Sequence, residues 1–356
     1  MSRPSRAPLL TTHQDFDFLN GHQPASGMNK EPRFTFLVAI AFTLNYIVGT
    51  GFLTLPWAFS RAGCFLSVLA LSGVLYFSIA SSLFLLEAMA RAETIHSIKD
   101  HDNAALLQDD HVMNSSKPNL IGNKKFEVTE LCSIFLGSYG KRMYTFCITI
   151  YLYCTLLAYS TVFANAFASH FNIGEASYHI YLTLFACMVI PLSCMELSEQ
   201  ILIQVTLTFG RFLMFFFMII TVSYAFLFQN TPFQNISPLH GNFEDFHIDQ
   251  LYIVLPVIVY ANIFHHSIPA LSHPVENKLL LGNIYTTSIM ICFISYLVLG
   301  VVVSLYFGGN TPPSSNLLWV HYMGINGKPS LLGSMIGMFV VIFPAFGTNL
   351  TLIFST

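Results

Sequence analysis

The sequence predicts an all-α, polytopic membrane protein, and three observations lead to this fold class. Of its 356 residues, 54% are hydrophobic and only 9% are charged, whereas a soluble globular domain carries about 25% charged residues. The mean hydropathy is +0.61. The charged residues leave eight stretches of 20 to 49 residues without Asp, Glu, Lys or Arg, and a helix needs about 20 apolar residues to cross the hydrocarbon core. Each stretch therefore has room for one membrane-spanning helix.

Apolar runs bounded by polar loops and turn signals place eight spans along the chain. We expect them at residues 34–59, 64–87, 143–168, 179–195, 203–228, 251–273, 281–307 and 331–355. Residues 1–33 read as a disordered segment. Residues 91–142 form a loop whose part at 96–125 is polar and flexible. Residues 126–139 have apolar positions at helical spacing, which predicts an amphipathic helix at the interface or docked on the bundle.

The distribution of basic residues predicts a cytosolic N-terminus. Of the fifteen Lys and Arg residues, twelve fall in segments that would then be cytosolic and two in segments that would be outside. Cytosolic loops carry such an excess. The remaining residue, Arg211, lies in the fifth predicted span. Either it snorkels to the cytosolic interface or it acts as a gate residue, and we expect snorkelling. The pattern does not distinguish a plasma membrane from an endolysosomal one.

Composition and motifs exclude several other classes. The formal net charge of −3 leaves no basic face for nucleic acid. The seven cysteines form no CxxC pair, so neither a disulfide framework nor a metal site is expected. There is no GxSxG, HExxH or GxxxxGK[ST] motif, and no enzyme activity or organic cofactor is predicted.

The first span contains helix-weakening residues in its middle. Gly49 and Gly51 flank Thr50, and Pro56 follows five residues after the second glycine. Glycine adds backbone entropy, and proline removes a donor and clashes with the preceding turn. Unpaired backbone groups at that depth are tolerated only beside protein or a water-filled cavity. The pattern predicts either an unwound ligand site or a small-residue packing face.

A second candidate interruption lies in the sixth span. Residues 256–270 hold Asn262, His265, His266 and Ser267 within an apolar segment that also contains two prolines. Polar groups at this depth usually face a cavity or a partner. Two interrupted helices five spans apart indicate an inverted-repeat secondary transporter with its site at the midplane. The alternative is a capped kink in which both imidazoles are bonded internally.

Four segments carry a resemblance to a known family. Residues 45–59 follow the pattern G-x-G-x-L-x-x-P-x-A-F after an asparagine, which resembles the first-helix motif of the amino acid/auxin permease superfamily. Residues 126–137, 146–159 and 265–275 are similar to corresponding stretches of the transmembrane protein 104 group within it. The resemblance covers residues 34–356.

This resemblance implies a leucine-transporter-type inverted-repeat fold. The first repeat would occupy residues 34–228 and the second would begin at residue 251. Backbone around Val48, Gly49, Thr50 and Gly51 would meet a substrate carboxylate, and the sixth-helix segment would complete the pocket. Its residues are Asn262, His265, His266 and Ser267.

The resemblance also implies a function and its alternatives. The chain would be a secondary active transporter of amino acids or related small solutes, coupled to Na⁺ or H⁺. A sodium ion would be held near Asn45, Val48 and Thr348. The chain would supply about 8 of 11 helices, with the second repeat only partly present at 251–356. The alternatives are a membrane sensor that binds an amino acid without transporting it, and an inactive truncated isoform. The expected partners are the substrate and the lipid bilayer, and protein partners are unspecified.

Overall fold

The computed structural model describes residues 34–105, 126–171, 173–192, 201–228, 233, 241, 246–324 and 329–353. Side chains are described over the same ranges except at 99–105, 190–192, 201 and 346–353. The predicted N-terminal segment at 1–33, most of the predicted polar loop and the sequence between the repeats fall largely outside these ranges. Within them the chain is helical, and its only extended contacts are two isolated bridges, Phe34 to Val275 and Phe233 to Tyr322.

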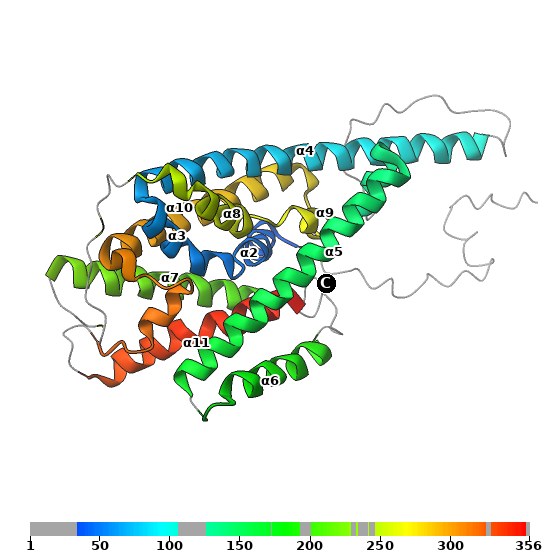
Figure 1. The fold of residues 1–356 in the computed structure, drawn as a ribbon. Helices are drawn as coiled ribbons and strands as arrows, with labels where there is room; N and C mark the ends of the chain where they lie inside the picture. Colours follow the sequence, from blue (N-terminus) through cyan, green and yellow to red (C-terminus); the bar gives the residue numbers. More distant parts are fainter. Residues whose placement is uncertain are drawn as a thin grey trace, which may run out of the picture.

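Ten α-helices and six 3₁₀ turns make up the described part of the chain (Figure 1). The α-helices are α2 (Phe36–Ile47), α3 (Leu55–Ala62), α4 (Cys64–Ala105), α5 (Val128–His170), α6 (Ser177–Leu192), α7 (Ile201–Phe228), α8 (Leu251–Ala261), α9 (Ile268–Ser272), α10 (Leu281–Phe307) and α11 (Leu331–Ile353). The 3₁₀ turns are η1 (Gly51–Thr54), η3 (Ile248–Gln250), η4 (His265–Ser267), η5 (Lys278–Leu280), η6 (Gly308–Asn310) and η7 (Ser315–Trp319).

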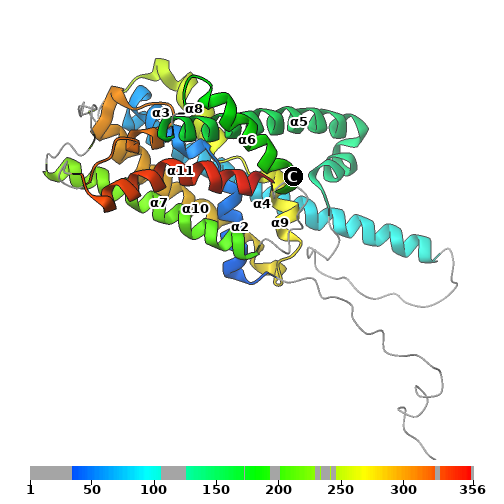
Figure 2. The same ribbon diagram turned by 90° about the horizontal axis from the view of Figure 1, so that it is seen from below.

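Helix α10 lies at the centre of the bundle and packs against α2, α3, α4 and α7. Helices α5 and α6 pair with one another, and α11 joins them to α7. The C-terminal part of α4 and the N-terminal part of α5 extend beyond the other helices in both views (Figures 1 and 2). At 1.5 Å per residue, the 42 residues of α4 are about 63 Å long. That is roughly twice the thickness of a hydrocarbon core.

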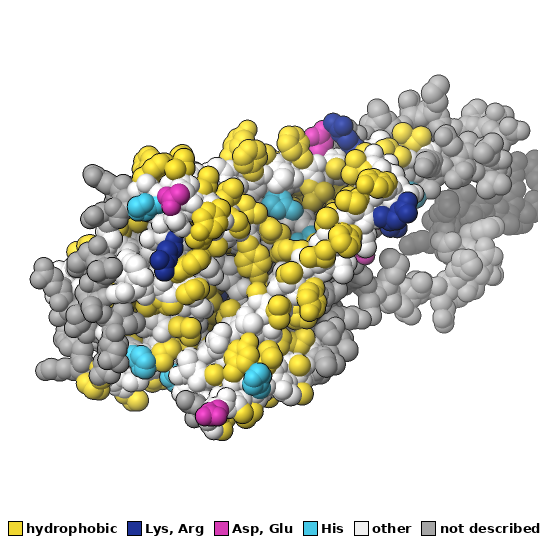
Figure 3. Space-filling view, viewed as in Figure 1, with side chains coloured by type: hydrophobic (Ala, Val, Ile, Leu, Met, Phe, Trp, Pro, Cys, Tyr) yellow, Lys and Arg dark blue, Asp and Glu magenta, His cyan; other side chains and the backbone are white. Residues whose placement is uncertain are grey.

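The outer surface of the bundle is apolar. Large side chains such as those of Leu37, Tyr76, Leu202 and Leu331 are exposed, and hydrophobic side chains cover most of the described face in Figure 3, with few charged ones. A surface of this kind is stable in lipid and would aggregate in water. The predicted lipid environment accounts for it.

The described helices agree with the predicted fold class. Five are long and apolar enough to cross a membrane, and the pair Phe36–Ile47 and Gly51–Ala62 makes a sixth if it is one span. The other two predicted spans, the fourth and the eighth, correspond to shorter apolar helices at Ser177–Val189 and Leu331–Ala345. The chain is thus a polytopic α-helical membrane protein, and the number eight stays a prediction.

One helix boundary differs from that expected, and one agrees with it. The second predicted span ends at residue 87 and the polar loop begins at 96, but α4 continues to Ala105. No glycine or proline interrupts the sequence after residue 87 in this helix, and an Arg91 to Glu87 ion pair one turn apart supports it. Element α5 contains two helical segments, because Gly137 interrupts the helical backbone with a φ of 71° and a ψ of −169°, a conformation that suits glycine. This break agrees with the predicted helix at 126–139 followed by a separate third span.

Candidate functional site

The first span is interrupted between α2 and α3. Helix α2 ends at Ile47, Val48 has a non-helical ψ of 76°, and a new helical segment begins at Gly51. The two segments are bent by 53°. Pro56 lies in the first turn of α3, where its missing N–H costs no helical hydrogen bond. The interruption therefore presents the C-terminal end of one short helix and the N-terminal end of another.

The two glycines of this interruption allow close approach of neighbouring elements. A Cβ atom on Gly51 would lie 2.8 Å from Cα and 3.1 Å from the backbone nitrogen of Ala261, at the end of α8. A Cβ atom on Gly49 would lie 2.5 Å from the hydroxyl oxygen of Tyr159 on α5. The chain needs glycine here because backbone and a tyrosine tip occupy the space of a side chain.

The sixth span is interrupted between α8 and α9. Helix α8 ends at Ala261, and the 3₁₀ turn η4 follows after three residues. Asn262 donates from Nδ2 to the carbonyl oxygen of Ile258 at 2.8 Å. The His265 ring nitrogen Nε2 lies 2.8 Å from the hydroxyl of Ser81 and 3.0 Å from the carbonyl oxygen of Ser78, both on α4. Side chains thus stabilise this interruption.

One tyrosine of α10 joins the two interruptions. The Tyr296 hydroxyl lies 3.3 Å from the carbonyl oxygen of Ile47 and 3.3 Å from that of Ala261. These are the last residues of α2 and α8, whose carbonyl groups have no partner within their own helices. The single hydroxyl proton of Tyr296 is therefore shared between the open ends of both short helices at the centre of the bundle.

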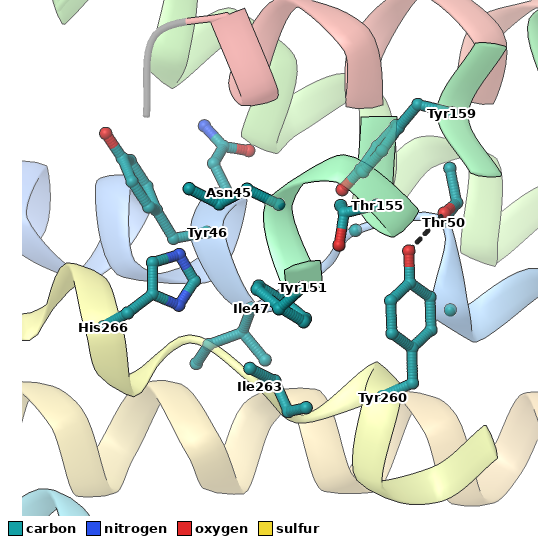
Figure 4. A pocket seen from close by; sticks show the side chains of 13 residues that line it. Asn45, Tyr46, Ile47, Thr50, Tyr151, Thr155, Tyr159, Tyr260, Ile263 and His266 are labelled. Carbon is teal, nitrogen blue, oxygen red and sulfur yellow. Dashed lines mark hydrogen bonds between the residues drawn. The ribbon is translucent and has the colours of Figure 1, made fainter. Parts of the chain in front are cut away.

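A cavity lies where the two interruptions meet α5. Its volume is about 40 Å³, which is room for about three waters. Its lining consists of Asn45, Tyr46, Ile47, Gly49, Thr50, Gly51, Tyr151, Leu152, Thr155, Tyr159, Tyr260, Ile263 and His266. Figure 4 shows the hydroxyls of Tyr159, Thr155 and Tyr260 pointing toward the segment that carries Thr50. The Thr50 and Tyr260 hydroxyls are 3.4 Å apart.

Two polar groups of the lining are available to a ligand. Nδ1 of His266 and the hydroxyl of Thr155 are buried and make no hydrogen bond within the described part of the chain. The His266 ring packs edge-on against Tyr151, with ring centroids 5.4 Å apart. Buried polar groups are normally hydrogen-bonded, so these two indicate where a bound molecule would meet the protein.

The predicted site residues fall into two groups. Gly49, Thr50, Gly51 and His266 line the cavity, as does Asn45, which was expected to bind sodium. Those outside its lining are Val48, Asn262, His265 and Ser267. Thr348 belongs to α11, but its side chain lies outside the described residues.

The four tyrosines of the lining were not predicted. Tyr151, Thr155 and Tyr159 are spaced at i, i+4 and i+8, so they share one face of α5. That spacing was a usable signal, but tyrosine also occurs on the outward face of the same helix, where Tyr153 is exposed. The sequence alone does not say which face meets the cavity.

The expectation for Arg211 was wrong. Its side chain is only 2% exposed, and Nη1 donates to the carbonyl oxygen and to Oδ1 of Asn45, both at 2.8 Å. Arg211 lies ten residues into α7, about 15 Å from its start, which is too deep for the guanidinium to reach the interface easily. It pairs with the open end of α2 because cations are favoured at helix C-termini.

The fold and the cavity define a class of protein: a polytopic helical membrane protein with a small polar cavity between interrupted helices. The chain belongs to the family described as "Transmembrane amino acid transporter protein", whose sequence model matches residues 32–351. This match confirms the resemblance of the first-helix motif. The family is one of transporters and not of enzymes.

Curated relatives support the same assignment and its subgroup. The chain is 27% identical over 336 residues to "Transmembrane protein 104 homolog" of Dictyostelium discoideum, covering 82% of this chain and 66% of that protein. It is 28% identical over 337 residues to the Caenorhabditis elegans homologue, covering 86% and 64%. It is 24% identical over 297 residues to "Transmembrane protein 104" of Homo sapiens, covering 68% and 58%. The chain thus spans 58–66% of the length of these relatives.

Proposed function

We propose that this chain binds a small neutral amino acid in the cavity and carries it across the membrane by alternating access. One observation supports this most directly: the cavity lies at the meeting point of two helix interruptions, in a chain that belongs to a transporter family. Paired interruptions at corresponding positions of two repeats are typical of inverted-repeat carriers. The leucine-transporter-type fold and the cytosolic N-terminus are part of this proposal.

The cavity has complementary ends for the two charges of an amino acid. The helical segment that begins at Gly51 presents its first N–H groups and the positive end of its dipole, which favour a carboxylate. The carbonyl ends of α2 and α8 and the faces of the tyrosine rings favour an ammonium group. A zwitterion is therefore recognised by backbone and aromatic groups, without an ion pair to a charged side chain.

The lining also restricts the substrate side chain. None of the residues around the cavity is Asp, Glu, Lys or Arg, so a charged substrate side chain would lose its hydration without gaining an ion pair. The volume of about 40 Å³ favours the smallest side chains. Thr155 and His266 add one hydroxyl and one imidazole nitrogen for hydrogen bonds.

Uptake by the purified 356-residue chain in proteoliposomes tests the proposal. We expect saturable uptake of radiolabelled L-alanine, competed by glycine and L-serine but not by L-glutamate or L-lysine. Thr155→Val keeps the shape of the side chain and removes the cavity hydroxyl. Losing about 1 kcal/mol of hydrogen bonding should raise KM roughly fivefold.

The matched control is Thr149→Val, the same change on α5 at an exposed position, and its KM should equal that of the wild type. Saturable binding of L-alanine without uptake would identify a sensor in place of a carrier. Absence of both binding and uptake for every neutral amino acid would refute the proposed function.

A further inference from the structure

One of the groups predicted to bind a sodium ion, Asn45, is bonded to a charged side chain of the protein. Sodium was expected near the carbonyl groups of Asn45 and Val48, with Thr348 opposite. In the structure the Arg211 guanidinium lies 2.8 Å from the Asn45 carbonyl oxygen and 2.8 Å from its Oδ1. Both are oxygens of the kind that hard cations prefer as ligands. Arg211 therefore bonds the Asn45 carbonyl oxygen, one of the ligands that the ion would need.

A polar face of α7 holds the guanidinium in this position. Gln204, Thr208 and Arg211 are spaced at i, i+4 and i+7, so they lie on one face of the helix. Asn45 donates from Nδ2 to the carbonyl oxygen of Gln204 at 2.5 Å and to its Oε1 at 2.8 Å. Thr208 donates to the carbonyl oxygen of Ala41 at 3.0 Å. Helix α7 thus contacts α2 through three polar side chains.

The contacts of Asn45 also fix the orientation of its amide. The Nδ2 side meets the oxygens of Gln204 and the Oδ1 side meets the donor of Arg211, so the two neighbours require the same assignment of oxygen and nitrogen. The Oδ1 atom is consequently directed at a cation donor. Asn45 also lines the cavity, so the guanidinium lies one residue behind the proposed substrate site.

The groups around Asn45 do not fit a sodium ion, because a guanidinium is already bonded to its oxygens. An ion bound there would have to displace Arg211 or lie beside its positive charge, and like charges repel strongly in a medium of low dielectric constant. Guanidinium stays protonated at any physiological pH. It also satisfies the open C-terminal end of α2, where a positive charge is favoured.

We propose that Arg211 is a built-in cation that replaces a coupling sodium ion, so that the first-helix interruption is stabilised, and substrate is bound, without Na⁺. The part of this proposal that concerns substrate rests on the proposed function. The part that concerns the cation site does not, because it can be tested on the stability of the protein alone.

Thermal unfolding of the purified chain in equal concentrations of NaCl, KCl or choline chloride tests the cation site. We expect the same Tm for the wild type in all three salts. Arg211→Ser removes the guanidinium and leaves the Asn45 oxygens open, so NaCl should raise its Tm by about 2 °C or more over choline chloride. Arg211→Lys keeps a cation and is the matched control, with no response to Na⁺.

Two results would overturn the proposal. One is a saturable rise of the wild-type Tm with Na⁺, which would place a sodium site beside Arg211. The other is a folded Arg211→Ser variant that does not respond to Na⁺, which would show that the position is not a cation site. If the Arg211→Ser variant does not fold, the wild type and Arg211→Lys still test the proposal, because a Na⁺-dependent Tm in either of them contradicts it.

Uptake provides a separate readout for substrate coupling. Replacing Na⁺ by choline should change the initial rate of L-alanine uptake by less than about twofold, and a loss of about tenfold, or 1.4 kcal/mol, would overturn Na⁺ independence. Absence of uptake in every salt would be a failure of the proposed function instead, and the unfolding experiment would still decide the role of Arg211.

Discussion

The two helix interruptions beside the cavity are stabilised in different ways. At the first, backbone meets backbone and tyrosine closely at Gly51 and Gly49, and Arg211 of α7 bonds the open end of α2. At the second, Asn262 caps its own helix and His265 contacts two serines of α4. The first interruption is therefore anchored on α7 and the second on α4.

The contacts at the two interruptions differ in how easily another residue could replace them. A side-chain hydrogen bond can be re-formed by a similar side chain or by water, whereas a backbone approach through glycine leaves no room for adjustment. Within the described part of the chain, Tyr296 is the residue whose hydroxyl reaches the ends of both α2 and α8. We expect substitutions at the first interruption to have the largest effects and those at the second the smallest.

Gly51→Ala should have the largest effect. The added methyl group would lie 2.8 Å from Cα of Ala261, and backbone cannot yield as a side chain can. We expect a loss of about 2–3 kcal/mol of stability from overpacking, together with loss of uptake. Thermal unfolding of the purified variant measures this. Gly73→Ala on α4, with nothing within 4 Å of the added atom, is the control and should be neutral. A Gly51→Ala variant as stable as the control would refute the close packing of the two interruptions.

Gly49→Ala should have an intermediate effect that a second change relieves. Its methyl group meets only the hydroxyl oxygen of Tyr159, at 2.5 Å, so we expect about 1–2 kcal/mol of destabilisation. Adding Tyr159→Phe removes that oxygen and should restore most of the loss. A double-mutant cycle on thermal stability measures the coupling between the two positions. Strictly additive effects would show that the two groups do not meet.

Tyr296→Phe should have a smaller effect that reaches both interruptions. It removes a hydroxyl and leaves two carbonyl groups, of Ile47 and Ala261, without this donor. A hydrogen bond of this kind contributes about 1 kcal/mol, which corresponds to a fall in Tm of roughly 2 °C. Uptake should fall as well, because both helix ends border the cavity. An unchanged Tm together with unchanged uptake would mean that Tyr296 does not join the two helices.

His265→Gln should have the smallest effect. Glutamine can still donate to the carbonyl oxygen of Ser78, so we expect a change within about 0.5 kcal/mol. Because His265 contacts α4 and does not line the cavity, the pH profile of L-alanine uptake should match that of the wild type. A shifted profile would show instead that this imidazole titrates during transport, and would make the second interruption part of the proton chemistry.

Much of the fold could be predicted from the sequence because lipid imposes a simple rule. Every backbone group must be satisfied within the segment, so long apolar runs between charges have to be helices. The same rule applies only within the membrane, so it does not predict where a helix ends in water. Helix α4 continues 18 residues past the predicted end at 87. The break at Gly137 interrupts α5 and separates the two elements that the sequence predicts there.

The candidate site was less predictable, since it depends on how helices rotate against one another. Glycine and proline marked the first-helix residues that reach the cavity, and His266 was found in an unusually polar segment. The cavity face of α5 was missed because tyrosines lie on more than one side of it. The depth of Arg211 was missed because its charge was considered alone. With Gln204 and Thr208 it forms a polar face, and such a face in an apolar helix usually meets protein.

Protection of the cavity from a thiol reagent tests directly whether the substrate binds there. In a variant without native cysteines, Thr155→Cys should react with a small water-soluble methanethiosulfonate, and saturating L-alanine should slow that reaction. Ser138→Cys, at an exposed position of α5 outside the predicted spans, should react at a rate that L-alanine does not change. Protection at 155 alone is the predicted result. Saturable L-alanine binding without protection at 155 would place the substrate site outside the cavity and contradict the proposed function.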